Sequence, residues 1–484
     1  SAAFEAAGYD PSYGEVTVSQ RKDLGDFQCN GALPAAKPYK KAPRQIAQDV
    51  VNQLNENPIF KEVSLAGPGF INLKLADRFV AEQTQQMAAD DSGRVGVEPA
   101  AEQEMIIVDY GGANVAKALH VGHLRAAIIG ESIKRLCKFL GHEVLGDVHL
   151  GDWGLQMGQI ITELKHRHPD WPYFDAEFSG PYPEKSPITI AQLEEIYPVA
   201  SGKSKTDPAF KEQAQTATSE LQNGRAGYRA LWQHFLDISV ADLKKNYGKL
   251  DVHFDLWLGE SDVQPLIPNM VQKLIDEGYA VESEGAIVVP IEEEDDKKEM
   301  PPLMLVKSNE SVGYGTTDLA TIVQRVNDYD PDAVLYVVDG RQQFHFKQVF
   351  RAAYKSGIAN EDKVSLEHNY FGTMNGKDGK PFKTREGGVM KLEDLIQMVI
   401  DKAYEKMAEI DAAADYPPEE REEIARQVGI AALKFADLVN HRTGDYVFDL
   451  DRFSSFEGRT GPYLLYAAVR TQSILRKAAE QGLQ

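Results

Sequence analysis

Apolar residues at the start of the chain recur at the spacing of a helix and then form a short run typical of a strand. The run is residues 70–74, and Gly67-Pro68-Gly69 introduces it. A stretch of small and charged residues then leads up to residue 100. This pattern predicts a small α+β domain over residues 1–100. The helical positions, which follow a proline, are Ile46, Val50, Val51 and Leu54.

From residue 104 the pattern changes to apolar strands that alternate with helices. Residues 104–110 and 143–150 predict two strands, and residues 120–141 predict a helix between them that ends at a glycine. Strand, helix and strand follow each other again between residues 333 and 372. Two such βαβ units predict a parallel sheet. We therefore predict an α/β fold, with a Rossmann-type parallel-sheet domain over residues 101–390.

The sheet pattern is interrupted by a polar segment and followed by a helical one. An insertion over residues 165–255 is rich in Pro, Ser, Lys and acidic residues up to residue 210, which predicts irregular structure, and reads as helical from 211 to 250. Residues 284–291 and the acidic run that follows predict a hairpin with a solvated loop. Residues 391–484 read as a C-terminal α-helical region. Its last segment places Leu465, Ala468, Val469 and Leu475 on one helix face.

Length and composition indicate a protein of several domains without membrane spans. With 484 residues it is long enough for about three domains of roughly 150 residues, and no run reaches the roughly 18 apolar residues of a membrane span. The N-terminus lacks the basic and apolar regions of a signal peptide. Cys29 and Cys137 form neither a zinc motif nor a disulfide framework, so we expect a reducing, cytoplasmic setting.

A net charge of −22 argues against a protein that coats nucleic acid, and we expect no DNA partner. A local basic patch is still compatible with a shaped nucleic-acid partner. It has the alternative interpretation of a solvated loop before a helix. The patch consists of Lys37, Lys40, Lys41 and Arg44.

The first candidate for a ligand-binding or catalytic site is the pair His120 and His123. It lies at the start of a predicted helix that follows a predicted strand. A helix N-terminus offers unpaired N–H groups and a positive dipole end to phosphates, and Gly122 between the histidines permits a close approach. No phosphate-binding loop competes, because Gly202-Lys203-Ser204 lacks the earlier glycine that such a loop requires. Further metal ligands at suitable spacing are not evident, so we expect no metal site.

A basic loop over residues 376–388 supports this interpretation. It follows directly on the predicted strand 364–372, and open α/β sheets bind ligands at the carboxyl ends of their strands. Lys383 and Arg385 could clamp the β- and γ-phosphates of a nucleotide. The loop alone would be an exposed basic turn, but with the histidine pair it indicates a reaction at the α-phosphate of ATP.

These motifs resemble a known family. The histidine pair resembles the HIGH signature of class I aminoacyl-tRNA synthetases, and KPFKTR resembles a degenerate form of their KMSKS element. More narrowly, the chain from about residue 10 to residue 484 resembles the arginyl-tRNA synthetases. It departs from them in YGGAN, VHLGDWG and GRQ, and it ends inside the helical bundle that this family uses for the anticodon. The similar stretches are GPGFIN, NVAKALHVGHLRAAIIG, LGDWGLQMG, YGTTDLA, VVDGRQQFHF, GKDGKPFKTREGG and NHRTGDYVFDLDRFSSFEGRTGPYLLYA.

The resemblance implies a reaction in two steps, with tRNA(Arg), L-arginine and ATP as partners. The carboxylate of arginine attacks the α-phosphate, and the terminal ribose of the tRNA then takes the arginyl group. Mg²⁺ would accompany ATP through phosphate oxygens. The resemblance assigns ATP binding to His120, Gly122, His123, Lys380 and Lys383, and catalysis to His120, His123, Lys117, Lys383 and Arg385.

The resemblance also implies a pocket for arginine, because carboxylates that pair bidentately distinguish a guanidinium from an ammonium. Without it, Asp109 would be a solvated strand-end acid and Asp318 a helix N-cap. It further suggests that Lys37 to Arg44 contact tRNA. The implied arginine-binding residues are Asp109, Asn114, Tyr314, Asp318 and Gln342, with Asp152, Trp153 and Gln156 on the pocket wall.

Two other classes of function remain open at this point. A nucleotidyltransferase of the same superfamily would activate a different carboxylate, and a non-catalytic binding protein would have descended from a synthetase. We expect a monomer that does not associate with membranes.

Overall fold

The computed structural model describes residues 1–294, 296, 299–308, 311–380, 390–409, 416–455 and 457–482. The chain divides into two compact units, Ser1–Pro99 and Ala100–Gln484. The larger unit holds both the parallel sheet and the C-terminal helices, and the further boundary that we predict at residue 390 stays a prediction. In the described ranges no helix is both long and apolar enough to cross a membrane.

The N-terminal unit packs helices on an antiparallel four-stranded sheet of order β1-β2-β4-β3. Ile46, Val50 and Val51 of the predicted stripe are buried in its core together with Cys29, which confirms an α+β unit. Its strands are β1 (Val16–Val18), β2 (Phe27–Cys29), β3 (Phe60–Ala66) and β4 (Phe70–Leu75), and its helices are α1 (Ala2–Ala6), α2 (Ala32–Tyr39), α3 (Pro43–Leu54) and α4 (Asp77–Ala88).

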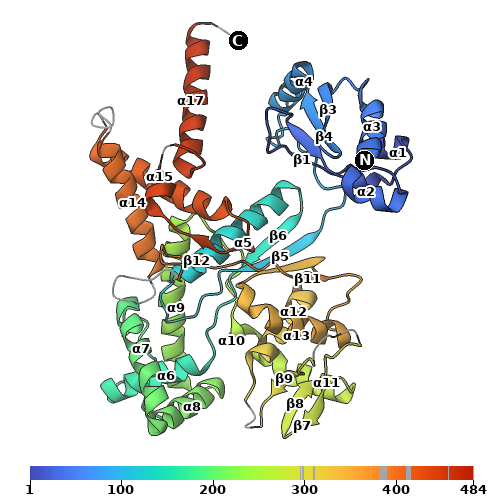
Figure 1. Ribbon diagram of the computed structural model, residues 1–484. Helices are drawn as coiled ribbons and strands as arrows, with labels where there is room; N and C mark the ends of the chain where they lie inside the picture. The colour runs from blue at the N-terminus through green and yellow to red at the C-terminus, as the bar shows by residue number, and fades with distance from the viewer. Residues whose placement is uncertain are drawn as a thin grey trace. The chain divides into compact units, whose positions relative to one another are not determined.

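The larger unit is built on a parallel sheet of order β11-β10-β5-β6 (Figure 1). The chain proceeds from β5 to β6 on one side and later returns to β10 on the other side of β5. The carboxyl ends of β5 and β10 therefore form the switch point where open α/β sheets bind ligands. The strands are β5 (Met105–Tyr110), β6 (Glu143–Asp147), β10 (Ala333–Val337) and β11 (Ser365–His368).

Helices cover both faces of this sheet, which confirms the predicted Rossmann-type arrangement. Ile106 and Val108 of β5 belong to the core under α5 (Val121–Phe139), and Ile107 belongs to the core under α12 (Tyr314–Tyr329) and α13 (Gln343–Lys355). Alternate residues of β5 thus enter different cores, as expected for a strand that is buried on both faces. Figure 1 shows α5 on one side of the sheet and α12 and α13 on the other.

The prediction of irregular structure up to residue 210 holds for residues 168–189 but was wrong for residues 190–210, which are largely helical. Thr189 is the N-cap of helix α7: its hydroxyl accepts from the backbone N–H of Gln192, while the Gln192 side chain accepts from the Thr189 N–H. This capping box satisfies N–H groups at the helix start, and the Pro, Ser and Lys residues obscured it. The helices of the insertion are α6 (Leu155–Arg167), α7 (Ile190–Thr206), α8 (Pro208–Gln222) and α9 (Ala226–Lys249).

In the sequence, a small antiparallel sheet follows the insertion and precedes α12. The predicted hairpin is β8 (Ala286–Val289) with β9 (Leu303–Val306), and β7 (Val281–Ser283) pairs with the other edge of β8. The acidic run between β8 and β9 is not simply solvated, because the Asp296 side chain is only 7% exposed and pairs with Arg351 at 2.6 Å. The short helices before this sheet are α10 (Glu260–Val263) and α11 (Ile267–Asp276).

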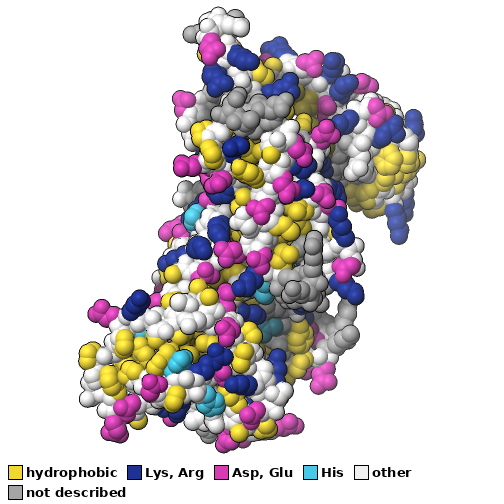
Figure 2. Space-filling view, turned by 90° about the vertical axis from the view of Figure 1, so that its left-hand side faces the viewer, with side chains coloured by type: hydrophobic (Ala, Val, Ile, Leu, Met, Phe, Trp, Pro, Cys, Tyr) yellow, Lys and Arg dark blue, Asp and Glu magenta, His cyan; other side chains and the backbone are white. Residues whose placement is uncertain are grey.

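The C-terminal part is helical, as predicted, apart from a short parallel pairing of β12 (Met374–Asn375) with β13 (Tyr446–Val447). The apolar positions predicted on the last helix are exposed, including Leu465, Val469 and Leu475. Its helices are α14 (Leu392–Ala408), α15 (Pro418–Leu438), α16 (Leu450–Phe453) and α17 (Gly461–Glu480). On the face drawn in Figure 2, acidic and basic side chains are interspersed.

Candidate functional site

The two histidines lie at the start of α5, each with one ring nitrogen bound to the backbone. His120 is the N-cap, and its Nδ1 accepts from the Gly122 N–H at 3.0 Å. His123 Nδ1 accepts from the His120 N–H at 3.0 Å. An accepting Nδ1 carries no proton, so in each neutral ring the proton is on Nε2. Both rings therefore keep Nε2–H as the donor for a ligand.

Burial keeps both imidazoles uncharged at neutral pH. It lowers the pKa of His120, with a further contribution from the nearby charge of Lys117. It lowers the pKa of His123 to about 3, assisted by the same lysine and by His120. The histidines thus offer neutral hydrogen-bond donors at a helix N-terminus. Positive charge at this site must come from other side chains, such as the exposed Lys117.

The chain just after the basic loop is hydrogen-bonded to the histidine motif. The Val121 N–H donates to Met390 O at 3.1 Å, and the Leu392 N–H donates to Leu119 O at 2.9 Å. At its near end, the loop follows directly on β12, and Lys380 O accepts from the Gly376 N–H at 2.8 Å. The structure therefore places residues 390–392, which follow the loop in the sequence, beside the start of α5. Lys383 and Arg385 lie outside the described residues, and Lys380 is exposed.

One buried arginine connects α5 with the chain that leads into this loop. Arg125, two residues after His123, is 2% exposed. It donates to Gly372 O at 2.7 Å, just before β12, and pairs with Asp437 of α15 at 2.8 Å. The helix that presents the histidines is thus fixed to the start of the basic loop and to the helical region.

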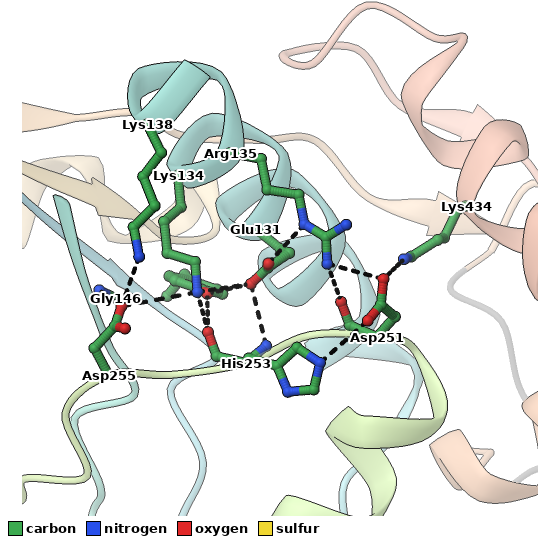
Figure 3. Close-up of polar contacts among 10 residues, drawn as sticks. Glu131, Lys134, Arg135, Lys138, Gly146, Asp251, His253, Asp255 and Lys434 are labelled. Carbon is green, nitrogen blue, oxygen red and sulfur yellow. Dashed lines mark hydrogen bonds and ion pairs between the residues drawn. The ribbon is translucent and has the colours of Figure 1, made fainter. Parts of the chain in front are cut away.

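A second polar network holds the middle of α5 against the chain that follows α9 (Figure 3). Glu131 accepts from the Tyr110 hydroxyl at 2.6 Å and from the His253 N–H at 3.2 Å. Arg135 pairs with Asp251 at 2.9 Å. Because Tyr110 is the last residue of β5, this network also fixes the point where the strand enters the site. Other contacts come from Lys134, Lys138, Gly146, Asp255 and Lys434.

Backbone hydrogen bonds join the loops at the carboxyl ends of the sheet. The Val115 N–H donates to Gly151 O at 3.0 Å, and the Glu260 N–H donates to Leu150 O at 3.0 Å. The segments after β5 and β6 and the start of α10 are thereby linked. Asn114 lies in the first of these segments and is exposed, and Gln342 is exposed just after β10. The structure thus brings the predicted substrate residues Asn114 and Gln342 to the carboxyl ends of β5 and β10.

Asp109 stands at the end of β5 and already has a guanidinium partner. Arg325 of α12, whose side chain is 1% exposed, pairs with Asp109 at 2.6 Å and with Asp147 at 2.7 Å. Burial raises the pKa of Asp109, and the charge of Arg325 opposes this. The interpretation of Asp109 as a solvated acid was wrong, because the residue is buried.

Asp318 lies in the second turn of α12, beside Tyr314, which is 70% exposed. Its Oδ2 accepts from His345 Nε2 at 2.5 Å. The interpretation of Asp318 as an N-cap was wrong, because α12 begins after Gly313. Asp318 therefore has no capping role that would occupy its carboxylate.

Sequence reasoning missed Glu260, the first residue of α10. Burial and the charge of Asp152 raise its pKa to about 7, and the charge of Asp318 contributes. Asp152 itself accepts from the N–H and the hydroxyl of Ser261, at 3.0 and 2.5 Å. A carboxyl whose pKa is raised by burial and by neighbouring charges is typical of a functional site. In the sequence, Glu260 could be read only as a residue at the start of a helix. That position does not indicate that Asp152 and Asp318 lie nearby in the fold.

The remaining predicted wall residues support the loop after β6. Trp153 is buried, with the Arg229 guanidinium 4.3 Å above its ring. Gln156 Nε2 donates to Gly151 O at 3.4 Å. His149 in the same loop has a backbone φ of 37°, a strained value for a residue other than glycine.

The basic patch of the N-terminal unit surrounds the junction of α2 and α3. Lys41 Nζ donates to the Tyr9 hydroxyl at 2.8 Å, and Arg44 donates to Gly67 O at 2.8 Å. Lys37 and Lys40 are exposed. Lys37 lies in the last turn of α2 and not in a loop.

Comparison with known proteins identifies the family of the chain. Residues 85–450 match the family described as tRNA synthetases class I (R), catalytic domain, and residues 1–75 match the arginyl tRNA synthetase N terminal domain. An arginine–tRNA ligase of Alkaliphilus oremlandii is 58% identical over 481 residues, which are 99% of this chain and 81% of the relative. One of Agathobacter rectalis is 54% identical over 483 residues, again 99% and 81% of the two chains.

Two solved structures share the fold. Arginyl-tRNA synthetase from Plasmodium falciparum has a TM-score of 0.76 and 26% identity, over 98% of this chain and 80% of that one. The enzyme from Thermus thermophilus has a TM-score of 0.71, over 99% and 81%, and at 21% identity it bears on the fold alone. The family match over most of the chain and the high identity to its members lead to one conclusion: the chain belongs to the class I arginyl-tRNA synthetases.

Proposed function

We propose that this chain activates L-arginine with ATP and transfers the arginyl group to the 3′ end of tRNA(Arg). One observation carries the proposal. At the carboxyl ends of one parallel sheet, the neutral histidines His120 and His123 lie at the start of α5. The carboxyls of Glu260 and Asp318 lie close enough for the charge of Asp318 to raise the pKa of Glu260. The first feature suits phosphates, and the second suits a cationic side chain.

The ATP half of the site would work by positioning and charge stabilisation. The Nε2–H groups of His120 and His123 would donate to phosphate oxygens. Lys117 and Lys380, with Lys383 and Arg385 of the loop, would supply the positive charge. A carboxylate oxygen of arginine then forms a bond to the α-phosphorus while the bond to pyrophosphate breaks.

Gly122 would let the nucleotide approach the start of α5. A Cβ added at this residue would lie 2.7 Å from the His120 ring, so any side chain would displace a donor. Mg²⁺ would be held through ATP oxygens, since no cluster of three or more suitable side chains is found in the part of the chain that the structure describes.

The arginine half would rest on Asp318 and Glu260 more than on Asp109. Arg325 is buried and stays charged, so Asp109 already has a guanidinium partner, which it shares with Asp147. Glu260 can release its proton when a guanidinium arrives, because its pKa lies at about 7. Tyr314 would close over the guanidinium. Asn114 and Gln342 would hold the α-amino and carboxylate groups, and Asp109 would help to position them.

The basic patch Lys37, Lys40, Lys41 and Arg44 would contact the phosphates of tRNA. The monomeric state and the cytoplasmic location stay predictions from the sequence.

The test is arginine-dependent exchange of pyrophosphate into ATP, measured with tRNA(Arg) present. We expect exchange by the wild-type chain, a loss of about 100-fold in kcat/KM for arginine in Asp318→Asn, and little change in Asp328→Asn, an exposed position on the same helix. Exchange that responds to another amino acid would favour the related nucleotidyltransferase. ATP binding without exchange, unaffected by His123→Ala, would favour a non-catalytic binding protein.

A further inference from the structure

The two aspartates predicted to bind arginine, Asp109 and Asp318, each have a hydrogen-bond partner within the protein, but the partners differ. Arg325 reaches two carboxylates and is almost fully buried. Among the residues that the structure describes, His345 pairs with one carboxylate, that of Asp318, and its side chain is 28% exposed. A histidine hydrogen bond can orient a carboxylate without neutralising it, since the ring donates N–H in its neutral form as well.

The position of His345 is set by the start of α13. It lies three residues after Gln342, and its ring meets the Phe346 ring edge-on, with centroids 5.4 Å apart. Nε2 holds one oxygen of Asp318, Oδ2, at 2.5 Å. Within the described ranges this is the one hydrogen bond found for the carboxylate, so Oδ1 remains for a ligand.

We infer that His345 is a positioning residue that sets the specificity for a guanidinium. By holding Oδ2, it fixes the rotation of the Asp318 carboxylate, so that Oδ1 keeps one direction beside the second acceptor, the Glu260 carboxyl. A guanidinium is a rigid planar fork and gains from two fixed acceptors, whereas an ammonium is a point charge on a flexible stem. The inference rests on the proposed function and adds the residue that orients its key carboxylate.

Removal of the histidine side chain frees the carboxylate to rotate. Loss of a hydrogen bond to a charged group corresponds to a rise in the KM for arginine of about tenfold or more. The inhibition constant of L-lysine, a competitor with a point charge, should change less than about twofold. kcat at saturating arginine and the KM for ATP should stay within about threefold, because His345 does not touch the reacting atoms.

The experiment compares His345→Ala and His345→Gln in pyrophosphate exchange with tRNA(Arg) present. Glutamine keeps an N–H donor for Asp318 and should restore the KM for arginine to within about threefold of the wild type. His253→Gln is the matched control. His253 also pairs with an aspartate, Asp251, at 3.1 Å, but on the exposed side of the network in Figure 3. If the alanine variant does not fold, His345→Asn takes its place, with an amide too short to reach Asp318.

The inference is overturned if His345→Ala leaves the KM for arginine unchanged. It is also overturned if the KM values for arginine and ATP rise together, or if glutamine is as damaging as alanine. Asp318→Asn in the same assay separates the two proposals. An inactive wild type would refute the proposed function. A wild type that is active and sensitive to Asp318→Asn, but indifferent to His345→Ala, would refute only the role of His345.

Discussion

Replacement of Glu260 by glutamine should stabilise the free protein and impair its use of arginine. Burial, followed by the charge of Asp152, raises the pKa of Glu260 from 4.5 to about 7. The folded protein therefore holds more protons than the unfolded chain between these two values, so its stability falls as pH rises through this window. Above about pH 7 the whole cost of ionising the buried carboxyl is present.

The size of the stability change follows from the difference between the folded and unfolded pKa values of Glu260. A change from 4.5 to about 7 corresponds to about 3 kcal/mol of lost stability at about pH 8. Solvent access at this partly exposed side chain reduces the expected gain of Glu260→Gln to about 1–3 kcal/mol. At about pH 4.5 the wild-type carboxyl is protonated in the folded state, so the variant should gain little.

Scanning calorimetry of the wild type and Glu260→Gln at about pH 5 and pH 8 measures this effect. We expect a rise in the melting temperature of about 1 °C for each kcal/mol, several times larger at pH 8 than at pH 5. The kcat/KM for arginine should fall at least tenfold at the same pH. Glu282→Gln, an exposed position in β7, is the control. Equal melting shifts at both pH values, or a wild-type KM for arginine in the variant, would refute the reasoning.

Three further predictions concern the other parts of the molecule. Gly122→Ala displaces the His120 ring and should lower kcat/KM for ATP about tenfold without a change in melting temperature; an unchanged rate would contradict this. Arg125→Gln leaves Asp437 unpaired in the core and should cost about 3–5 kcal/mol, measured by denaturant unfolding. Lys40→Glu should raise the KM for tRNA several-fold at low salt and leave the KM for arginine unchanged; a raised KM for arginine would contradict a separate tRNA contact.

The elements of the fold could be read from the sequence because their signals are local. The apolar run that ends at Asp109 and the helix that begins after His120 depend on periodicity and on residues within one or two turns. The structure confirms both elements. The same reasoning failed over residues 190–206. Their Pro, Ser and Lys residues favoured a prediction of irregular structure, although the capping box at Thr189 is a helix-start signal.

The sequence by itself determined the order of the elements, the donor pair at the start of α5 and, through its motifs, the family. Only the tertiary structure decided which carboxylates remain for a substrate. Asp109 meets Arg325 across 216 residues of sequence, and Glu260 acquires its raised pKa first from burial and then from the charges of the distant Asp152 and Asp318. The physical reason is that burial and charge act through space, so the state of a carboxyl depends on neighbours that only the folded chain brings together.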